Sequence, residues 1–249
     1  MERCGCSYKK ELEGPSNPKI MKILILTLAD DSMREMADIS ALNKMRYAQK
    51  HDYYFAYEKK ICKDLGVGRG NCSWNKIVYV KRYLPFYDWV FWTDADSLIL
   101  NQTRKIEEFL PTTNGKDFII GKDRQPWINA GQFFIRNCEW SNNFLALVEL
   151  HTWVERVGPQ YGWWEQGAIR YLIEQPYHAE HVQYVPCKTF NGYADFIRED
   201  RDLAWMRPDL FSPGDFLCHY SGLVMRNGVS HYNEVIEKMK LDLETILIK

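Results

Sequence analysis

The chain has 249 residues, of which 46% are hydrophobic, 26% charged and 14% aromatic. This composition is typical of a globular protein with a substantial core, and it excludes a disordered chain or a small disulfide scaffold. The 32 basic side chains balance the 33 acidic ones without forming a basic run, which argues against nucleic acid as the main partner. No apolar run reaches the ~20 residues of a membrane span, and no signal-peptide core opens the sequence.

The first residues, 1–18, combine glycines and prolines with charges and are predicted to form a flexible leader. The remainder, 19–249, is predicted to be a single domain because no linker divides it. Its first element is a strand over 20–28, since an unbroken apolar run is typical of a strand covered on both faces of a parallel sheet. Ser32 and Glu35 then form the S-x-x-E pattern that begins a helix.

Strands and helices continue to alternate. A strand is predicted at 53–57, a helix carrying Trp74 must end near Pro85, and another strand follows at 89–93. Three such β-α units in a row predict an α/β protein with a Rossmann-like, mainly parallel sheet flanked by helices. The rest of the chain is predicted to contain apolar strand-like stretches at 118–120, 132–135 and 216–219, and helices around 144–154, 164–174 and 235–246.

A D-x-D motif, Asp94 and Asp96, stands at the end of the predicted strand 89–93. Ligands of open α/β sheets bind beyond the carboxyl ends of strands, and carboxylates at i and i+2 can direct two oxygens at one divalent cation. Such a cation can neutralise a diphosphate. The motif alone is weak, because about one D-x-D arises by chance and a turn or helix cap is the alternative. A second pair, Asp200 and Asp202, follows no apolar strand and is interpreted as a solvated loop.

Further motifs stand around this pair in a characteristic order: Trp74-Asn75-Lys76, the aromatic strand with D-x-D at 89–96, the N-A-G segment at 129–140, Glu165-Gln166 within 164–168, and H-Y-S-G at 219–222. Together they resemble the retaining GT-A glycosyltransferases, in the group of the fungal α-galactosyl- and α-mannosyltransferases and plant xyloglucan α-xylosyltransferases. The resemblance covers residues 19–228 and implies the GT-A fold. It also implies transfer of a sugar from a nucleotide diphosphate donor, expected to be UDP-linked, to a glycan hydroxyl, with retention at the anomeric carbon.

The resemblance implies roles for individual residues. Asp96 and His219 would bind a metal that Asp94 can share, and Mn²⁺ is expected, with Mg²⁺ as the alternative, because carboxylate, imidazole and phosphate ligands suit Mn²⁺. Catalysis would fall to Glu165 or Gln166, since a carboxylate could form a covalent intermediate whereas an amide carbonyl would stabilise positive charge. The sequence leaves both open. The residues expected to bind the donor are Thr27, Leu28, Lys76, Asp94, Asp123, Asn129 and Gly222.

Each assignment has a structural alternative. A lone histidine after an apolar strand, such as His219, is more often a satisfied core residue. Lys76 could be an ordinary exposed lysine, and Asp123 and Asn129 could cap loops. Related enzymes follow the H-x-x-G motif with a lysine that grips pyrophosphate, and whether Arg226 replaces it here stays open.

Two other functions compete with sugar transfer. A metal-dependent sugar nucleotidyltransferase would need a glycine-rich phosphate loop, but the glycine-rich stretch at 66–70 lacks the G-K-[ST] end of such a loop. A catalytically inactive glycan-binding relative is the non-enzymatic alternative. Relatives are usually anchored in the Golgi membrane, and this chain shows no such helix. A cytoplasmic location with reduced thiols is therefore expected, the alternative being a Golgi lumenal catalytic domain separated from its anchor.

Overall fold

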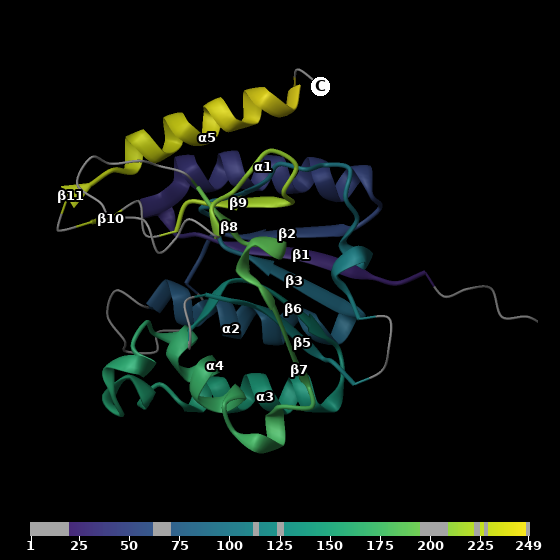
Figure 1. The fold of residues 1–249 in the computed structure, drawn as a ribbon, viewed down its shortest axis with the longest axis vertical. Coiled ribbons are helices and arrows are strands. Elements are labelled where there is room, and N and C mark those ends of the chain that lie inside the picture. Colours follow the sequence, from purple (N-terminus) through teal and green to yellow (C-terminus); the bar gives the residue numbers. More distant parts are fainter. Residues whose placement is uncertain are drawn as a thin grey trace, which may run out of the picture.

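The computed structural model describes residues 20–61, 71–111, 115–123, 127–194, 209–221, 225–226 and 229–247. A six-stranded sheet crosses the molecule with helices on both faces (Figure 1). Its strands lie in the order β2 (Tyr54–Glu58), β1 (Ile23–Leu28), β3 (Trp89–Thr93), β6 (Ile128–Arg136), β5 (Phe118–Lys122) and β7 (Val182–Pro186). Of these six, β6 alone runs against its neighbours, so the predicted α/β class with a mainly parallel sheet is confirmed.

Helices cover both faces of this sheet. On one face lies α1 (Arg34–Lys50), with α5 (Tyr232–Leu247) packed beyond it (Figure 1). On the other face lie α2 (Asn71–Tyr83), α3 (Glu139–Leu150) and α4 (Glu165–Ile173). In chain order α1 follows β1 and α2 follows β2, which gives the alternation that the sequence predicts.

The side chains of β1 show why this strand is apolar throughout. Successive residues of a strand point to opposite faces of the sheet. Ile23 and Ile25 pack in a cluster with Tyr47 of α1, whereas Leu24 and Leu26 pack with residues of α2, α3 and α4. Both faces of the strand are therefore buried, as the unbroken apolar run indicates.

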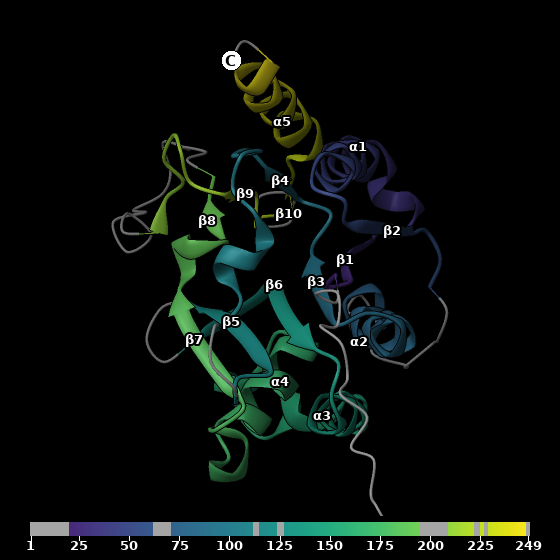
Figure 2. The same ribbon diagram turned by 90° about the vertical axis from the view of Figure 1, so that its right-hand side faces the viewer.

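A smaller sheet carries the second half of the site. Its strands lie in the order β4 (Ser97–Ile99), β9 (Leu217–His219) and β8 (Gly192–Tyr193). Figure 2 shows these strands on the side of the large sheet where α1 and α5 lie, and Leu98 and Tyr220 pack in one cluster with Val235 of α5. A two-stranded hairpin, β10 (Met225–Arg226) and β11 (Val229–Ser230), precedes α5.

Several predicted boundaries are wrong by a few residues. The first strand begins after Ile20, which is exposed outside the sheet. A 3-10 turn, Asp31–Met33, precedes α1, and its cap is the Asp30 carboxylate, which accepts a hydrogen bond from the Ser32 amide. The predicted Ser32 cap is therefore corrected to Asp30. Val154 lies in a separate 3-10 turn and not in α3.

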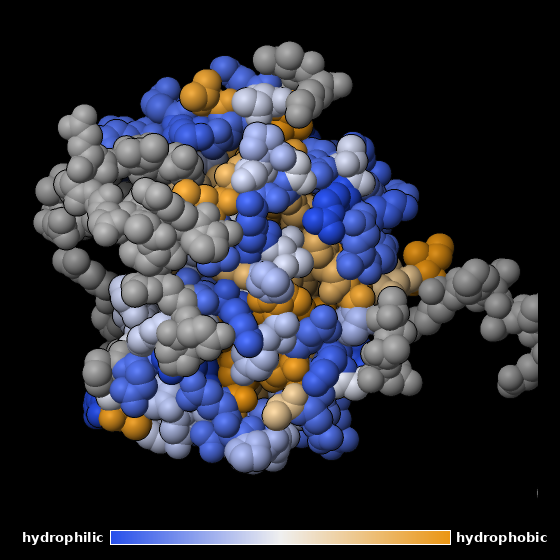
Figure 3. Space-filling view, viewed as in Figure 1, coloured by the Kyte–Doolittle hydropathy of each residue, from blue (hydrophilic) through white to orange (hydrophobic). Residues whose placement is uncertain are grey.

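Some predicted features lie outside the described residues: the leader 1–18, the glycine-rich stretch 66–70, Gly222, and the second D-x-D pair, Asp200 and Asp202. Among the helices that are described, none is long and apolar enough to cross a bilayer. The face of the molecule in Figure 3 is largely hydrophilic, with small apolar patches between the polar side chains.

Candidate functional site

Asp94 and Asp96 occupy the tight turn between β3 and β4, at the carboxyl end of β3. The Trp92 indole Nε1 donates a hydrogen bond to Asp94 Oδ1 at 2.7 Å, and the Asp94 amide donates to the Gly131 carbonyl at 2.8 Å. The Ser97 hydroxyl donates to the Asp94 carbonyl at 2.7 Å. These bonds hold the turn while the carboxylates of Asp94 and Asp96 remain 30% and 22% exposed.

His219 lies beside this turn because β9 pairs antiparallel with β4 and sets His219 opposite Ser97. Its Nε2 is 3.1 Å from Asp96 Oδ1, and one ligand atom from each of Asp94, Asp96 and His219 lies within 4.8 Å of the others. Burial alone would raise the pKa of Asp96, but the His219 imidazole and the Lys44 ammonium outweigh burial and lower that pKa. Two carboxylates beside an imidazole form a donor set that can hold one divalent ion.

Lys76 of α2 lies on the other side of Asp94 and is buried, so it is not an ordinary exposed lysine. Its Nζ donates to Glu165 Oε1 at 2.7 Å and to the Ala130 carbonyl at 2.8 Å, and it lies 3.1 Å from Asp94 Oδ1. Burial would lower the pKa of Lys76, but the two carboxylates outweigh burial and raise that pKa. A permanent cation therefore links the D-x-D turn to Glu165.

Glu165 and Gln166 begin α4, and their side chains contact Lys76 of α2 and the start of β6, respectively. Glu165 Oε1 accepts the bond from Lys76, while its Oε2 is buried without a hydrogen-bond partner among the described residues. Gln166 Oε1 accepts a bond from the Ala130 amide at 2.8 Å. Of the two catalytic candidates, Glu165 is thus the one with a side-chain oxygen not already engaged.

The turn that precedes α4 is tightly wound. Trp163 and Trp164 have φ values of 74° and 55°, in the left-handed region that side chains with a Cβ rarely adopt. Gly167 lies so close to Tyr161 that a Cβ at this position would be 1.9 Å from the Tyr161 carbonyl oxygen. This strained turn sets the direction in which Glu165 enters the site.

The end of β1 lies next to the D-x-D turn. Leu28 lines a cavity of about 160 Å³ together with Lys76, Asp94 and Asp96. Thr27 is not among the residues that line it, and its buried hydroxyl has no hydrogen-bond partner in the described part of the chain. The structure therefore brings Leu28 to the site and leaves Thr27 in the layer beneath.

The remaining donor-binding candidates lie at the same edge of the sheet. Asn129 is buried: its Nδ2 donates to the Tyr193 hydroxyl, and its Oδ1 accepts from the Gly131 amide, both at 2.8 Å. Asp123 follows β5 and its amide donates to the Trp127 carbonyl at 3.0 Å. Both side chains thus have positions near strand ends, and their contact with a donor stays a prediction.

Lys44 of α1 is a contact residue that the sequence reasoning missed. It is fully buried, and its Nζ donates to the Asp94 carbonyl at 2.6 Å and to the Ser40 hydroxyl at 2.7 Å. Ser40 in turn donates to the Ser97 carbonyl at 2.8 Å. Burial lowers the pKa of Lys44 to about 7. The available signal was the i,i+4 pair of polar residues Ser40 and Lys44 on the face that carries Met36.

Asn191 was also missed, and no sequence motif marks it. Its Oδ1 lies 2.8 Å from Nδ1 of His219, on the side of the imidazole away from Asp96. Arg226, the open replacement for a phosphate-binding lysine, lies in β10.

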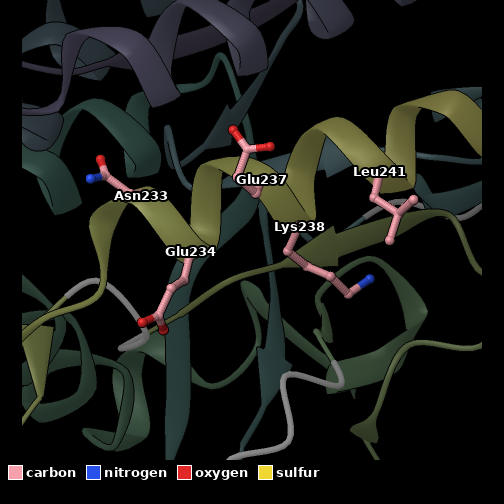
Figure 4. A pocket seen from close by; sticks show the side chains of 5 residues that line it. All are labelled: Asn233, Glu234, Glu237, Lys238 and Leu241. Atoms are coloured by element: carbon pink, nitrogen blue, oxygen red, sulfur yellow. The ribbon is translucent and has the colours of Figure 1, made fainter.

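A separate surface hollow of about 510 Å³ follows the terminal helix α5 (Figure 4). Its lining consists of Asn233, Glu234, Glu237, Lys238 and Leu241. None of the predicted site residues lines it, so it is separate from the cavity at the D-x-D turn.

Several solved structures with a similar fold are glycosyltransferases. A glycosyltransferase involved in the glycosylation of the major capsid of PBCV-1 superposes with a TM-score of 0.65 at 17% identity, covering 88% of this chain and 99% of that one. The galactosyltransferase LgtC has a TM-score of 0.58 at 15% identity, covering 86% and 95%. At such identities the likeness shows the fold alone, and it confirms the predicted GT-A fold.

Sequence relatives point the same way. An uncharacterized alpha-1,2-galactosyltransferase of Schizosaccharomyces pombe is 25% identical over an alignment of 207 residues, and the match covers 68% of this chain and 58% of that protein. Galactomannan galactosyltransferase 1 of Cyamopsis tetragonoloba is 27% identical over an alignment of 128 residues, and the match covers 47% of this chain and 27% of that protein. The galactosyl transferase GMA12/MNN10 family matches residues 16–114 and 112–222. Because this match extends over most of the chain, the protein belongs to the galactosyl transferase GMA12/MNN10 family.

Proposed function

We propose that the protein is a metal-dependent, retaining glycosyltransferase that moves a sugar from a nucleotide diphosphate donor, expected to be a UDP-sugar, to a hydroxyl of a glycan. The observation that carries the proposal is the convergence of Asp94, Asp96 and His219, with ligand atoms within 4.8 Å, at the carboxyl end of β3 beside a cavity of about 160 Å³. Family membership supports sugar transfer as the reaction class.

The residues fit a divalent ion. Two carboxylates and one imidazole leave coordination positions for phosphate oxygens, and this mixture of oxygen and nitrogen ligands suits Mn²⁺ better than Mg²⁺. When bound, such an ion would stabilise the negative charge that grows on the departing diphosphate. Asp96, in the turn between β3 and β4, and His219, at the end of β9, would hold it, and Asp94 would share it while bonded to Trp92.

Lys76 connects the proposed metal position with the proposed reacting carboxylate. Its ammonium contacts Asp94 and Glu165 together, so it fixes the position of Glu165 relative to the D-x-D turn. It also offsets the repulsion between two carboxylates in one buried site. We therefore assign Lys76 to the organisation of the site, alongside its predicted role in donor binding.

Retention requires either a protein nucleophile or attack by the acceptor on the face from which the donor leaves. Oε2 of Glu165 has no hydrogen-bond partner in the described part of the chain, which favours this carboxylate for the first route. The side-chain oxygen of Gln166 already accepts a bond from the Ala130 amide, which leaves one lone pair to stabilise positive charge. Alanine variants of each should distinguish the two, because the residue that acts in the transition state loses turnover more than donor affinity.

The proposal is tested with UDP-glucose, UDP-galactose, UDP-xylose and GDP-mannose, each with Mn²⁺ or with EDTA. We expect one donor to raise the melting temperature only when Mn²⁺ is present, and to be hydrolysed slowly to the nucleoside diphosphate. Asp96→Asn should reduce this hydrolysis at least ~100-fold, whereas Asp38→Asn, which removes a half-exposed carboxylate on α1, should not.

Three results would contradict the proposal. Hydrolysis by Asp96→Asn within a few-fold of wild type would remove the metal role. Release of pyrophosphate in place of nucleoside diphosphate would favour a nucleotidyltransferase. Glycan binding without hydrolysis of any donor would favour an inactive relative.

A further inference from the structure

The imidazole of His219 is held in one orientation from three sides. The Tyr193 ring stacks on it, with centroids 6.1 Å apart and planes 23° from parallel. Gly131 lies so close that a Cβ there would be 2.4 Å from His219 Cε1. The third contact is Asn191, whose Oδ1 is 2.8 Å from Nδ1. The ring therefore cannot turn without displacing one of these neighbours.

A buried asparagine at position 191 is expected to destabilise the fold unless its side-chain oxygen makes a functional contact. The side chain is fully buried, and its Nδ2 has no hydrogen-bond partner among the residues that the structure describes. A buried amide donor without an acceptor destabilises the folded state, and an apolar side chain of the same size would avoid that penalty. The contact that remains for this carboxamide is the one between Oδ1 and His219.

We propose that Asn191 is a positioning residue that keeps a proton on Nδ1 of His219 and so presents Nε2 to a divalent ion at the D-x-D turn. When Nδ1–H donates to Asn191 Oδ1, a neutral imidazole has its lone pair on Nε2, the nitrogen that lies 3.1 Å from Asp96 Oδ1. Histidines that bind metals commonly donate their other N–H to such a partner. Because an asparagine is uncharged, it orients the ring without adding a third negative charge beside Asp94 and Asp96.

This inference rests on the proposed metal site and adds a residue to it. The first test is the protonation of the His219 ring in the metal-free wild-type protein, read from the ring nitrogen shifts in long-range ¹H–¹⁵N spectra and assigned with His219→Gln. Nε2 lies 3.1 Å from the Asp96 carboxylate and can also carry a proton when no metal is bound, so we expect a proton on Nδ1, with or without a second one on Nε2. A ring whose single proton lies on Nε2 would overturn the inference, whatever the variants show.

The second test is the Mn²⁺ dissociation constant, measured by calorimetry on the full chain. Asn191→Leu keeps the volume but removes the acceptor, and it should weaken Mn²⁺ binding about 10–100-fold. Asn191→Asp keeps an oxygen facing Nδ1 and should bind Mn²⁺ closer to wild type than to the leucine variant. Asn142→Leu is the matched control, since it removes one side-chain hydrogen bond on α3, which Asn142 Nδ2 donates to the Cys138 carbonyl.

The outcomes separate this inference from the proposed function. If wild type and Asn191→Leu bind Mn²⁺ equally tightly, the positioning role is refuted and the metal site stands. If wild type binds no Mn²⁺, the metal-dependent function itself fails. If Asn191→Leu does not fold, Asn191→Asp and the ring protonation of the wild-type protein decide, because neither depends on that variant.

Discussion

Two clusters of charged side chains lie at opposite edges of the large sheet. The Asp117 cluster, which consists of Asp117, Arg136 and His181, lies at the amino ends of β5 and β7 and the carboxyl end of β6. Arg136 Nε donates to one carboxylate oxygen of Asp117 at 2.6 Å, and the His181 ring bonds the other oxygen. Both oxygens of this buried carboxylate therefore bond to Arg136 or His181. We infer that the cluster stabilises the fold and takes no part in ligand binding.

The D-x-D cluster, which consists of Asp94, Asp96, Lys76, Glu165 and His219, lies at the other edge, where β1 and β3 end. It contains the same kinds of group, but one oxygen of Glu165 has no partner among the described residues and the two aspartates stay partly exposed. Ion pairing alone thus does not identify a functional site. Spare bonding capacity at the carboxyl ends of parallel strands does.

The largest expected effect comes from Lys76→Met, which would leave the buried Glu165 and the partly exposed Asp94 without their cation. We expect a loss of about 3–5 kcal/mol in the free energy of unfolding, because an uncompensated buried charge is strongly destabilising. Lys81→Met is the control on the same helix: its half-exposed pair with Glu149 should contribute less than about 1 kcal/mol. Denaturant unfolding measures the free energy of unfolding of both variants. Equal values for Lys76→Met and Lys81→Met would show that the contacts of Lys76 with Asp94 and Glu165 do not stabilise the protein.

Asp117→Asn tests whether the Asp117 cluster is purely structural. Burial would raise the pKa of Asp117, but the bonds from His181 and Arg136 outweigh burial and lower that pKa. Its stabilising effect is therefore present above the unfolded-state pKa of about 3.9 and is lost as the pH falls through the lower, folded-state pKa.

At pH 7 we expect Asp117→Asn to reduce the free energy of unfolding by about 3 kcal/mol, and the difference from wild type to shrink in acid. Donor hydrolysis per folded molecule should not change. A loss of hydrolysis without a loss of stability would erase the distinction between the two clusters.

Gly131→Ala should disturb the D-x-D cluster through packing alone. The new Cβ would stand 2.4 Å from His219 Cε1, so the imidazole must shift. We expect a loss of about 2 kcal/mol in stability from overpacking, together with weaker Mn²⁺ binding. The control is Gly121→Ala in β5. Its new Cβ would lie 3.3 Å from the Cα of Cys187, and we expect Mn²⁺ binding to stay unchanged. Calorimetry on both variants makes the comparison.

The smallest expected effect concerns Lys44. Its pKa is lowered by burial to about 7, so between this value and the unfolded-state pKa near 10.4 the unfolded chain binds more protons than the folded one. The free energy of unfolding should therefore rise with pH, by about 1 kcal/mol from pH 8 to pH 9 relative to Lys44→Met. If the free energies of unfolding of wild type and Lys44→Met changed with pH in parallel over this range, Lys44 would remain charged in the folded protein.

Much of the fold and part of the site follow from local patterns. The apolar runs before Asp94 and His219 identify strands, and ligands gather at the ends of such strands, so both residues are predictable. β8 has only two residues and β7 is half exposed, so neither carries a clear pattern. The reversed direction of β6 depends on pairing with β3 and β5, which no local sequence encodes.

The missed contact residues share one physical cause. Lys44 and Asn191 act through atoms that are 50 and 28 residues away in the chain, and only the folded sheet brings those atoms together. A lysine inside a helix and an asparagine in a loop are otherwise unremarkable by residue type and spacing. The motifs therefore point to the residues that face the cavity, and the residues that hold them from behind come from the three-dimensional packing.

The reversed strand β6 has one more consequence for experiments on this protein. Its first residues meet the D-x-D edge with main-chain groups: the Ala130 carbonyl accepts from Lys76, the Ala130 amide donates to Gln166, and the Gly131 carbonyl accepts from Asp94. Every residue type supplies these carbonyls, and every type except proline supplies the amide. Scanning mutagenesis of side chains would pass over them, whereas amide-to-ester replacement would reveal how much of the site is built from the polypeptide itself.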